Sequence, residues 1–204
     1  LLQKRHTQIA SWVEAAETDG RVHGRVLTLR TVTGRMAHTS PNMAQVPAVY
    51  SPFGKECRSC WTVQNPETHS LVGTDASGLE LRVLDHFMDD QNFVNDILNG
   101  DVHTANQKMA GLQNRDQAKT FIYALMYGAG AAKIGLIVGG DSKTGENLIS
   151  KFMSNMPKFN LLKNKLTKAS ESGMIRGLDG RLLHIRSPHA SLNTLIQGSG
   201  AVIC

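Results

Sequence analysis

Cationic and aromatic residues recur at a regular spacing in the segment from residue 115 to residue 128, which reads RDQAKTFIYALMYG. Four such residues are each separated by four positions: Arg115, Lys119, Tyr123 and Tyr127. Because an α-helix turns by about 100° per residue, this spacing predicts one helical face that carries all four side chains. Arginine and lysine meet phosphate charge, and a tyrosine ring offers a flat surface to a base or a sugar. This face is therefore suited to a nucleoside triphosphate.

The same helix has a second, apolar stripe that is suited to packing on a core. It consists of Ala118, Phe121, Ile122 and Leu125. A buried back and a cationic front are expected of a helix that borders a binding site. Taken alone, the front would equally be explained as a solvated charged face, because such faces are common.

A second segment of chemical interest is Asp75-Ala-Ser-Gly-Leu-Glu80. The apolar run at 71–74 predicts a short strand that leads into Asp75. Ser77 followed three residues later by Glu80 predicts a capping box that opens an amphipathic helix ending at Met88. Asp75 would then lie at a strand-to-helix junction. Its carboxylate there is either a metal ligand or a charge that favours the start of the helix.

Together with Arg35 in a Thr-Gly-Arg sequence, these two segments resemble, in order and spelling, family A DNA polymerases, the DNA polymerase I superfamily. In that family the DxSxxE motif holds the aspartate that binds both magnesium ions. The RxxxKxxxYxxxYG helix closes over the incoming nucleotide. The resemblance runs from about Gly20 to Cys204. Four segments are similar to replicative polymerases of short-tailed bacteriophages: SPNMAQVP, GDVHT, RSPHA and NTLIQG. The resemblance implies a DNA-directed DNA polymerase that adds deoxynucleotides to a primer on a DNA template.

The resemblance implies that two Mg²⁺ ions are the cofactors. Asp75 would bind both ions, and the backbone carbonyl of Ala76 would complete the coordination of the second, which agrees with the preference of magnesium for hard oxygen ligands. The ions would stabilise the attacking 3′ oxygen and the departing pyrophosphate. Lys119 would be the second catalytic residue, as the proton donor to the pyrophosphate.

The resemblance also implies a set of nucleotide-binding residues: Ala76, Ser77, Gly78, Leu79, Glu80, His103, Arg115, Lys119, Tyr123 and Tyr127. Glu80 would exclude a ribose 2′ hydroxyl, although the capping box explains this residue as well. His103 would contact the nucleotide's phosphates, although a lone histidine is more often packed in a core. Tyr123 occupies a position where the family carries tyrosine or phenylalanine, and its hydroxyl implies that dideoxynucleotides are accepted.

Five further residues resemble positions that reach the minor groove of the primer and template: Arg35, Asn42, Gln45, Asn193 and Gln197. Hydrogen-bond donors in the minor groove sense correct pairing without reading sequence, because its acceptors look alike in all correct pairs. Each single Asn or Gln is otherwise explained as a surface or capping residue.

The expected fold class is α+β: a fragment of a right-hand polymerase with a partial palm of antiparallel strands and mainly helical fingers. The expected parts are the end of the thumb at 1–20 with a helix at 1–18, the first part of the palm at 21–90, the fingers at 91–190, and a helix at 191–204 that returns to the palm. Residues 22–33 read as a strand before a loop at 40–47. Asp179-Gly180, between Met174 and Ile185, predicts a tight hairpin.

The composition is compatible with a DNA polymerase but is not specific to one. A formal net charge of +5 and a pI near 9.2 allow a polyanionic partner. No apolar run approaches the roughly 20 residues that a membrane-spanning helix needs. Three cysteines, Cys57, Cys60 and Cys204, lack the second pair of a zinc ribbon and suggest free thiols in a reducing cytoplasm. The expected partners are primer–template DNA and dNTP, with no membrane, in the host cytoplasm if the source is a bacteriophage; a processivity factor in the parent protein is left open.

Two other interpretations compete with the polymerase. A two-metal nuclease would assemble Asp75, Glu80, Asp101 and His103 around its ions. A basic nucleic-acid-binding module would bind without catalysis. The glycine-rich run at 128–140 lacks the Gly-Lys-Ser/Thr ending of a phosphate loop.

One departure from the family is an absence. The second metal-binding aspartate of the family lies in a downstream His-Asp-Glu motif, and this tripeptide does not occur in the 204 residues. Since the uncapped ends also suggest that the reading frame continues on both sides, we expect the 204-residue chain by itself not to extend primers.

Overall fold

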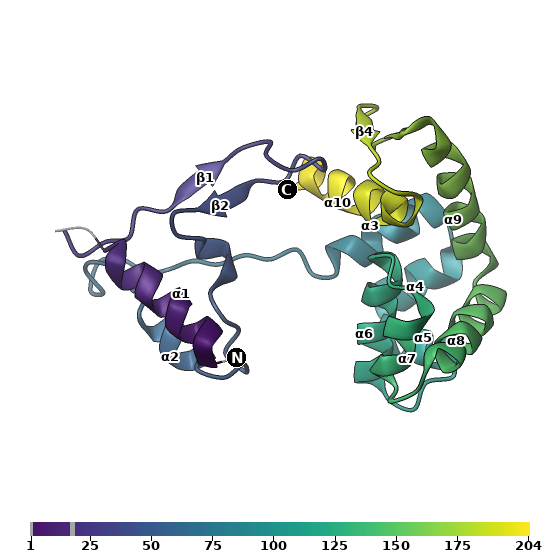
Figure 1. Ribbon diagram of the computed structural model, residues 1–204, viewed down its shortest axis with the longest axis horizontal. Helices are drawn as coiled ribbons and strands as arrows, with labels where there is room; N and C mark the ends of the chain where they lie inside the picture. The colour runs from purple at the N-terminus through teal and green to yellow at the C-terminus, as the bar shows by residue number, and fades with distance from the viewer. Residues whose placement is uncertain (1, 17–18) are drawn as a thin grey trace. The chain divides into compact units, whose positions relative to one another are not determined.

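The structure is a computed structural model that describes residues 2–16 and 19–204. The chain divides into two compact units, Leu1–Thr31 with Arg35–Ala76 and Val32–Gly34 with Ser77–Cys204 (Figure 1). The division of the same residues into thumb, palm and fingers stays a prediction. Helices dominate, and the described strands form two small antiparallel sheets, so the α+β expectation is confirmed.

The first unit is built around one long helix and a short sheet. Its elements are α1 (Leu2–Glu14), β1 (Arg25–Leu27), β2 (Ala37–Thr39), the 3₁₀ turn η1 (Met43–Gln45) and α2 (Gly54–Ser59). β1 pairs antiparallel with β2, with Val26 opposite His38. The buried ring of Trp12 packs edge-on against Trp61, with the ring centroids 5.1 Å apart.

The second unit contains the remaining helices and a hairpin. Its elements are α3 (Leu79–Met88), α4 (Gln91–Asn99), α5 (Val102–Ala110), α6 (Arg115–Met126), α7 (Ala131–Ile137), α8 (Ser142–Asn155), α9 (Pro157–Ala169), η2 (Ser170–Ser172), β3 (Met174–Arg176), β4 (Leu182–His184), η3 (Pro188–Ala190) and α10 (Ser191–Ile203). α5 packs on α6, α7 on α8, and α10 on α3. One hydrophobic cluster runs through these helices and reaches the hairpin.

Aspartate and asparagine side chains begin several of these helices. The residues are Asp90 for α4, Asp101 for α5, Asn114 for α6 and Asp141 for α8, and each accepts a hydrogen bond from a backbone N–H of the first turn. Because the first four N–H groups of a helix have no partner within it, such caps fix where a helix starts. Aromatic side chains then hold α6, α8 and α9 together, since the ring of Phe152 contacts those of Phe121 and Phe159 edge-on at 5.2 and 5.6 Å.

The hairpin and the last helix were predicted correctly. β3 pairs antiparallel with β4, with Ile175 opposite Leu183. The N–H of Gly180 donates to the carbonyl of Gly177, and Gly180 has a φ of +83°, a conformation in which glycine carries no steric penalty. The loop is therefore a three-residue turn rather than a two-residue one.

The strand predictions were partly wrong. Within 22–33 only Arg25–Leu27 forms a strand, because Leu29 adopts a φ of +54°, which ends the extended conformation. Residues 71–74 form no strand, since within the described residues no neighbouring strand pairs with them. The helix expected at 1–18 is confirmed over Leu2–Glu14, and residues 1, 17 and 18 lie outside the described residues.

The capping box at Ser77 and Glu80 is also a wrong prediction. The residue that precedes α3 is Gly78, with a φ of +60°, and no side chain caps this end. The carbonyl of Ser77 instead accepts a hydrogen bond from Nε of Arg82 at 2.9 Å. Glu80 lies in the first turn and bonds a residue far along the chain, so tertiary contact replaces the local motif.

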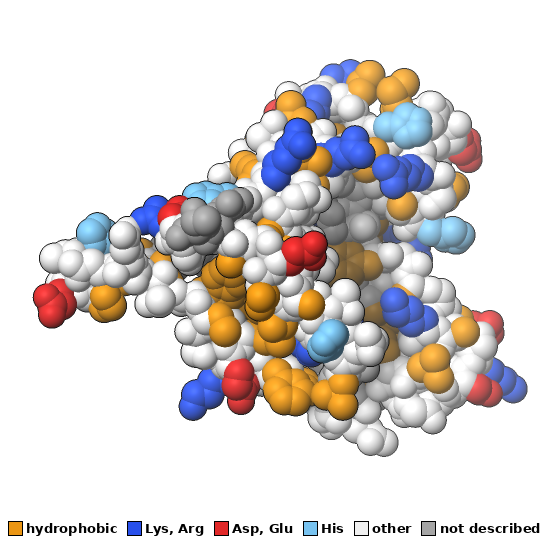
Figure 2. Space-filling view, turned by 60° about the vertical axis from the view of Figure 1, so that its left-hand side comes forward, with side chains coloured by type: hydrophobic (Ala, Val, Ile, Leu, Met, Phe, Trp, Pro, Cys, Tyr) orange, Lys and Arg blue, Asp and Glu red, His pale blue; other side chains and the backbone are white. Residues whose placement is uncertain are grey.

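Other predictions about the surface can be compared directly with the structure. None of the helices in the described part of the chain has the length and apolar character needed to span a bilayer. The thiols of Cys57, Cys60 and Cys204 are free, as predicted. Several Lys and Arg side chains gather on the face shown in Figure 2, as the net charge leads one to expect.

Candidate functional site

α6 presents the cationic and aromatic face that its spacing predicts. Asn114 caps the helix by accepting from the N–H of Gln117 at 2.8 Å. Arg115 and Lys119 are exposed, and Tyr123 is half-buried. Tyr127 follows the last helical residue, so it lies at the end of the face and not inside the helix. The rings of Tyr123 and Tyr127 are tilted neighbours, with centroids 6.4 Å apart.

The back of α6 is buried as predicted. Ala118, Phe121 and Ile122 have no exposed surface, and Leu125 is 4% exposed. Burying aliphatic and aromatic side chains contributes about 1.5–3 kcal/mol each to folding. This fixed back holds the front of α6 in place, so the charged face does not depend on its own weak surface contacts.

α5 brings His103 to the same face. Its ring lies 6.3 Å from the ring of Tyr123. Burial lowers the pKa of His103, and the positive charges of Arg115 and Lys119 lower it further against the opposing effect of Asp101. The imidazole is therefore predominantly neutral at neutral pH, and its buried Nδ1 has no hydrogen-bond partner in the described part of the chain.

Arg115 is held at the start of α6 by a carboxylate from the start of α5. Its Nε donates to Oδ2 of Asp101 at 2.5 Å, although the two residues are 14 positions apart. The hydrogen bond from Arg115 is the largest cause of a lowered pKa at Asp101. The sequence did not predict this pair, and the only local signal is that Asp101 precedes Thr104 by three residues, as an N-cap does.

α3 contributes Glu80 to the end of the α6 face. The hydroxyl of Tyr127 donates to Oε1 of Glu80 at 2.7 Å. Burial raises the pKa of Tyr123, and the negative charge of Glu80 raises it further, so the Tyr123 hydroxyl keeps its proton. The second unit therefore holds all six of these residues, on α3, α5 and α6 and at the end of α6: Glu80, His103, Arg115, Lys119, Tyr123 and Tyr127.

The predicted nucleotide-binding residues before Glu80 are divided between the units. Ser77, Gly78 and Leu79 lead into α3 in the second unit, whereas Asp75 and Ala76 end the first. Asp75 is exposed, in a stretch without regular secondary structure. Its carboxylate and the Ala76 carbonyl are hard oxygen donors of the type that Mg²⁺ accepts.

No group of three or more His, Cys, Asp or Glu side chains within the described residues could hold a metal ion. Glu80, Asp101 and His103, the three residues of the nuclease interpretation that lie in the second unit, therefore do not form such a group. Asp101 instead accepts hydrogen bonds from its own helix and from Arg115.

The predicted DNA-contacting residues also fall in both units. Arg35, Asn42 and Gln45 are exposed in the first unit, and Asn193 and Gln197 are partly buried one helical turn apart on α10 in the second. Asn42 also accepts from the N–H of Ala44 at 3.1 Å, so its capping role is real.

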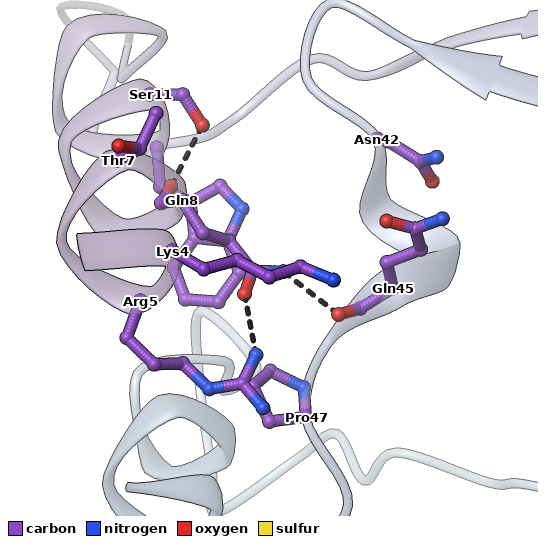
Figure 3. Close-up of a pocket in the computed structure, with 9 residues that line it drawn as sticks. Lys4, Arg5, Thr7, Gln8, Ser11, Asn42, Gln45 and Pro47 are labelled. Atoms are coloured by element: carbon purple, nitrogen blue, oxygen red, sulfur yellow. Dashed lines mark hydrogen bonds between the residues drawn. The ribbon is translucent and has the colours of Figure 1, made fainter. Parts of the chain in front are cut away.

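Asn42 and Gln45 line a pocket of about 660 Å³ within the first unit (Figure 3). Lys4, Arg5 and Gln8 on α1 line the same pocket, and the Gln8 side chain donates to the carbonyl of Gln45 at 2.7 Å. Figure 3 shows Lys4 reaching from α1 toward the turn that carries Gln45. The sequence analysis did not single out Lys4 and Arg5 as residues that line this pocket. The only signal for them in the sequence is their positive charge on the first helix.

Comparison with known proteins places these residues in a family context. The sequence profile of DNA polymerase family A matches residues 2–204. The chain is 43% identical over 232 aligned positions to the DNA-directed DNA polymerase of Enterobacteria phage T3, and equally to that of Escherichia phage T7. Each alignment covers all of this chain and 33% of the relative, so the chain spans about a third of the length of these phage enzymes.

More distant relatives give the same assignment. The thermostable DNA polymerase I of Thermus filiformis is 30% identical over 176 positions, covering 81% of this chain and 21% of that protein. A solved structure of the POL domain of Pol1 from M. smegmatis, in complex with DNA primer-template and dNTP, has a TM-score of 0.83 over 98% of this chain and 39% of that one. At 19% identity this structure shows a shared fold. Since the family profile matches almost the whole chain and the phage enzymes align with all of it, the chain belongs to DNA polymerase family A.

Proposed function

We propose that the protein containing this chain is a DNA-directed DNA polymerase that transfers deoxynucleotides to a primer 3′ end in bacteriophage DNA replication, in the host cytoplasm. The observation that carries this proposal is the arrangement of one face of α6 with Glu80 and His103 beside it. The phage relatives are named DNA-directed DNA polymerases, and this chain aligns with them along its whole length. Because it spans a third of theirs, the activity of the whole protein is inferred.

Each side chain on the α6 face has a chemical role in binding dNTP. Arg115 and Lys119 neutralise the triphosphate, since both are exposed and positively charged. The neutral His103 donates one hydrogen bond to a phosphate oxygen. The protonated Tyr123 hydroxyl serves as a donor near the sugar, which would compensate for the missing 3′ oxygen of a dideoxynucleotide.

Glu80 provides discrimination against ribonucleotides. Its carboxylate is fixed by the hydrogen bond from Tyr127, so it does not swing aside easily. A fixed carboxylate beside the sugar leaves no room for a 2′ hydroxyl. The selectivity against ribonucleotides therefore depends on the hydrogen bond between Tyr127, at the end of α6, and Glu80 of α3, and not on either residue alone.

Asp75 and the carbonyl of Ala76 would hold two Mg²⁺ ions together with ligands from the rest of the protein. Bound there, the ions supply electrostatic stabilisation to the attacking and departing oxygens. Lys119 delivers a proton to the pyrophosphate as it leaves, since a lysine beside phosphate both neutralises charge and donates. The 204-residue chain alone is expected not to extend primers, because the His-Asp-Glu motif that carries the family's second metal-binding aspartate does not occur in it.

Primer–template DNA is the macromolecular partner. Asn193 and Gln197 would reach the minor groove from α10, and Arg35, Asn42 and Gln45 would do so from the first unit. Lys4 and Arg5 add positive charge to the pocket that Asn42 and Gln45 line, which suits a phosphate backbone. A processivity factor stays a prediction of the resemblance to phage enzymes.

Replacing Lys119 in the full-length protein tests the proposed function. Lys119→Ala should lower the rate of nucleotide incorporation by at least roughly a hundredfold, because loss of general acid catalysis typically costs 10²–10⁴. Affinity for primer–template, measured by fluorescence anisotropy, should change by less than about threefold. Lys133→Ala, on the exposed surface of α7, is the matched control and should leave both quantities unchanged.

Equal losses of incorporation and DNA affinity in Lys119→Ala would refute the assigned role. A nucleic-acid-binding module without catalysis makes a different prediction, because it needs no metal. In that case any dNTP binding would be independent of Mg²⁺ and unaltered by Asp75→Ala, whereas the polymerase requires Mg²⁺-dependent dNTP binding that Asp75→Ala abolishes.

A further inference from the structure

Asp101 connects the starts of two neighbouring helices through one carboxylate. Its Oδ1 accepts from the backbone N–H of His103 at 3.1 Å and thereby caps α5. Its Oδ2 accepts from the hydroxyl of Thr104 at 2.9 Å and from Nε of Arg115 at the start of α6. The two oxygens therefore have separate tasks, and only Oδ2 reaches across to the other helix.

The geometry of this contact determines which part of Arg115 is available to a ligand. A guanidinium presents five N–H donors in a planar fork, and Asp101 binds it through Nε. Within the described part of the chain, the two Nη groups of Arg115 make no hydrogen bond. The pair is about half exposed, with side-chain exposures of 52% for Arg115 and 39% for Asp101, so the free edge of the fork is accessible to solvent.

Without this contact the long Arg115 side chain would sample many rotamers at the surface of the helix. Ordering a free arginine side chain on binding costs rotamer freedom and so weakens the binding of the ligand. A carboxylate that holds Nε removes part of this cost before the ligand arrives. The same carboxylate caps α5 by accepting from the backbone N–H of His103, so it also fixes the first turn that carries the His103 ring.

We propose that Asp101 is a positioning residue, which orients Arg115 so that its Nη groups face the triphosphate of the incoming nucleotide and sets His103 beside it. This inference rests on the proposed function, in which Arg115 and His103 contact the phosphates. Asp101 itself touches no phosphate; it acts through Arg115. The negative charge of Asp101 does not prevent phosphate binding, because it pairs with Arg115 alone. Lys119 has no such partner among the described residues.

The chain contains a matched control for this role. Asp141 caps α8 in the same Asp-x-x-Thr sequence, accepting at 2.8 Å from both the N–H and the hydroxyl of Thr144. In the described residues Asp141 has no arginine partner. Asp101→Asn and Asp141→Asn each keep an oxygen that caps a helix, since asparagine and aspartate are comparable caps. Only Asp101→Asn replaces the oxygen that accepts from Arg115.

The test is steady-state incorporation of a single dNTP by the full-length protein on primer–template DNA. For Asp101→Asn we expect the KM for dNTP to rise roughly tenfold while kcat changes by less than about threefold, as loss of ground-state binding predicts. Asp141→Asn should keep both constants within about twofold of the wild type. Asp101→Ser, which caps α5 but is too short to reach Arg115, should behave like Asp101→Asn.

A double-mutant cycle decides whether Asp101 acts through Arg115. In an Arg115→Ala background, adding Asp101→Asn should change KM by less than about twofold, because the partner is already absent. The proposal is overturned if Asp101→Asn alone leaves KM unchanged, if it raises KM equally in the Arg115→Ala background, or if Asp141→Asn has the same effect. Absence of incorporation by the wild-type protein would instead reject the proposed function.

Discussion

The hydrogen bond from Tyr127 to Glu80 is a single contact on which selectivity for the sugar should depend. Tyr127→Phe removes the donor hydroxyl and keeps the ring. The Glu80 carboxylate then loses the contact that fixes it, and it can move away from a 2′ hydroxyl. We expect the preference for dNTP over NTP, measured as the ratio of their kcat/KM values in the full-length protein, to fall about tenfold, the size of effect of one lost hydrogen bond to a charged group.

Tyr50 supplies the control for this experiment, because this residue is 94% exposed in the first unit. Tyr50→Phe should leave the preference unchanged. Glu80→Ala should reduce discrimination at least as much as Tyr127→Phe does. Unchanged rejection of ribonucleotides by Glu80→Ala would show that this carboxylate does not contact the sugar.

At the scale of elements, the close approach of α7 and α8 has a specific requirement. A Cβ placed on Gly145 of α8 would lie only 1.9 Å from the carbonyl oxygen of Ala131 at the start of α7. Backbone cannot move aside as a flexible side chain can. Gly145→Ala should therefore destabilise the fold by about 1–3 kcal/mol, as overpacking does, in spite of the higher helix propensity of alanine. Urea unfolding followed by circular dichroism measures this.

Gly200 of α10 is the matched helical glycine. A Cβ there would lie 3.4 Å from a methyl carbon of Leu79, an ordinary contact. Gly200→Ala should be neutral or stabilising by up to about 1 kcal/mol, because alanine restricts the unfolded chain. Equal effects of the two substitutions would mean that the α7–α8 crossing can relax, and that the glycine is not required there.

At the scale of the whole molecule, the two units differ in how they are stabilised. The hydrophobic cluster lies entirely between Leu81 and Ile196, in the second unit. In the first unit Trp12 and Cys57 are the buried hydrophobic residues among those described. Apolar burial is the main favourable term in folding, so the second unit should carry most of the stability.

We expect residues 77–204, expressed alone, to keep a helical circular dichroism spectrum and to unfold cooperatively in urea. The reason is that the hydrophobic cluster is complete without residues 2–76. Non-cooperative unfolding of this segment would show that the part of the second unit that it lacks, residues 32–34 with the close approach of Gly34 to Arg181, is required. A segment 2–76 as stable as 77–204 would contradict the expected difference.

The sequence by itself determined the elements whose signals are local. The spacing of Arg115, Lys119 and Tyr123 predicted a helix with a charged front and a buried back, and both are observed. Asp179-Gly180 predicted the hairpin, because a turn is set by the conformational freedom of adjacent residues. The family was likewise identified from motifs that are read along the chain, and the comparisons confirmed it.

Only the tertiary structure decided which partners these residues have. Ser77 and Glu80 were predicted to form a capping box, but Glu80 bonds Tyr127, 47 positions away. Asp101 looked like a helix cap and also proved to be the partner of Arg115. The apolar residues at 71–74 formed no strand, since a strand needs a neighbour that its own sequence does not specify. Local propensity determines the type and the ends of a helix or a turn from neighbouring residues. The partner of a side chain depends instead on how separate elements pack.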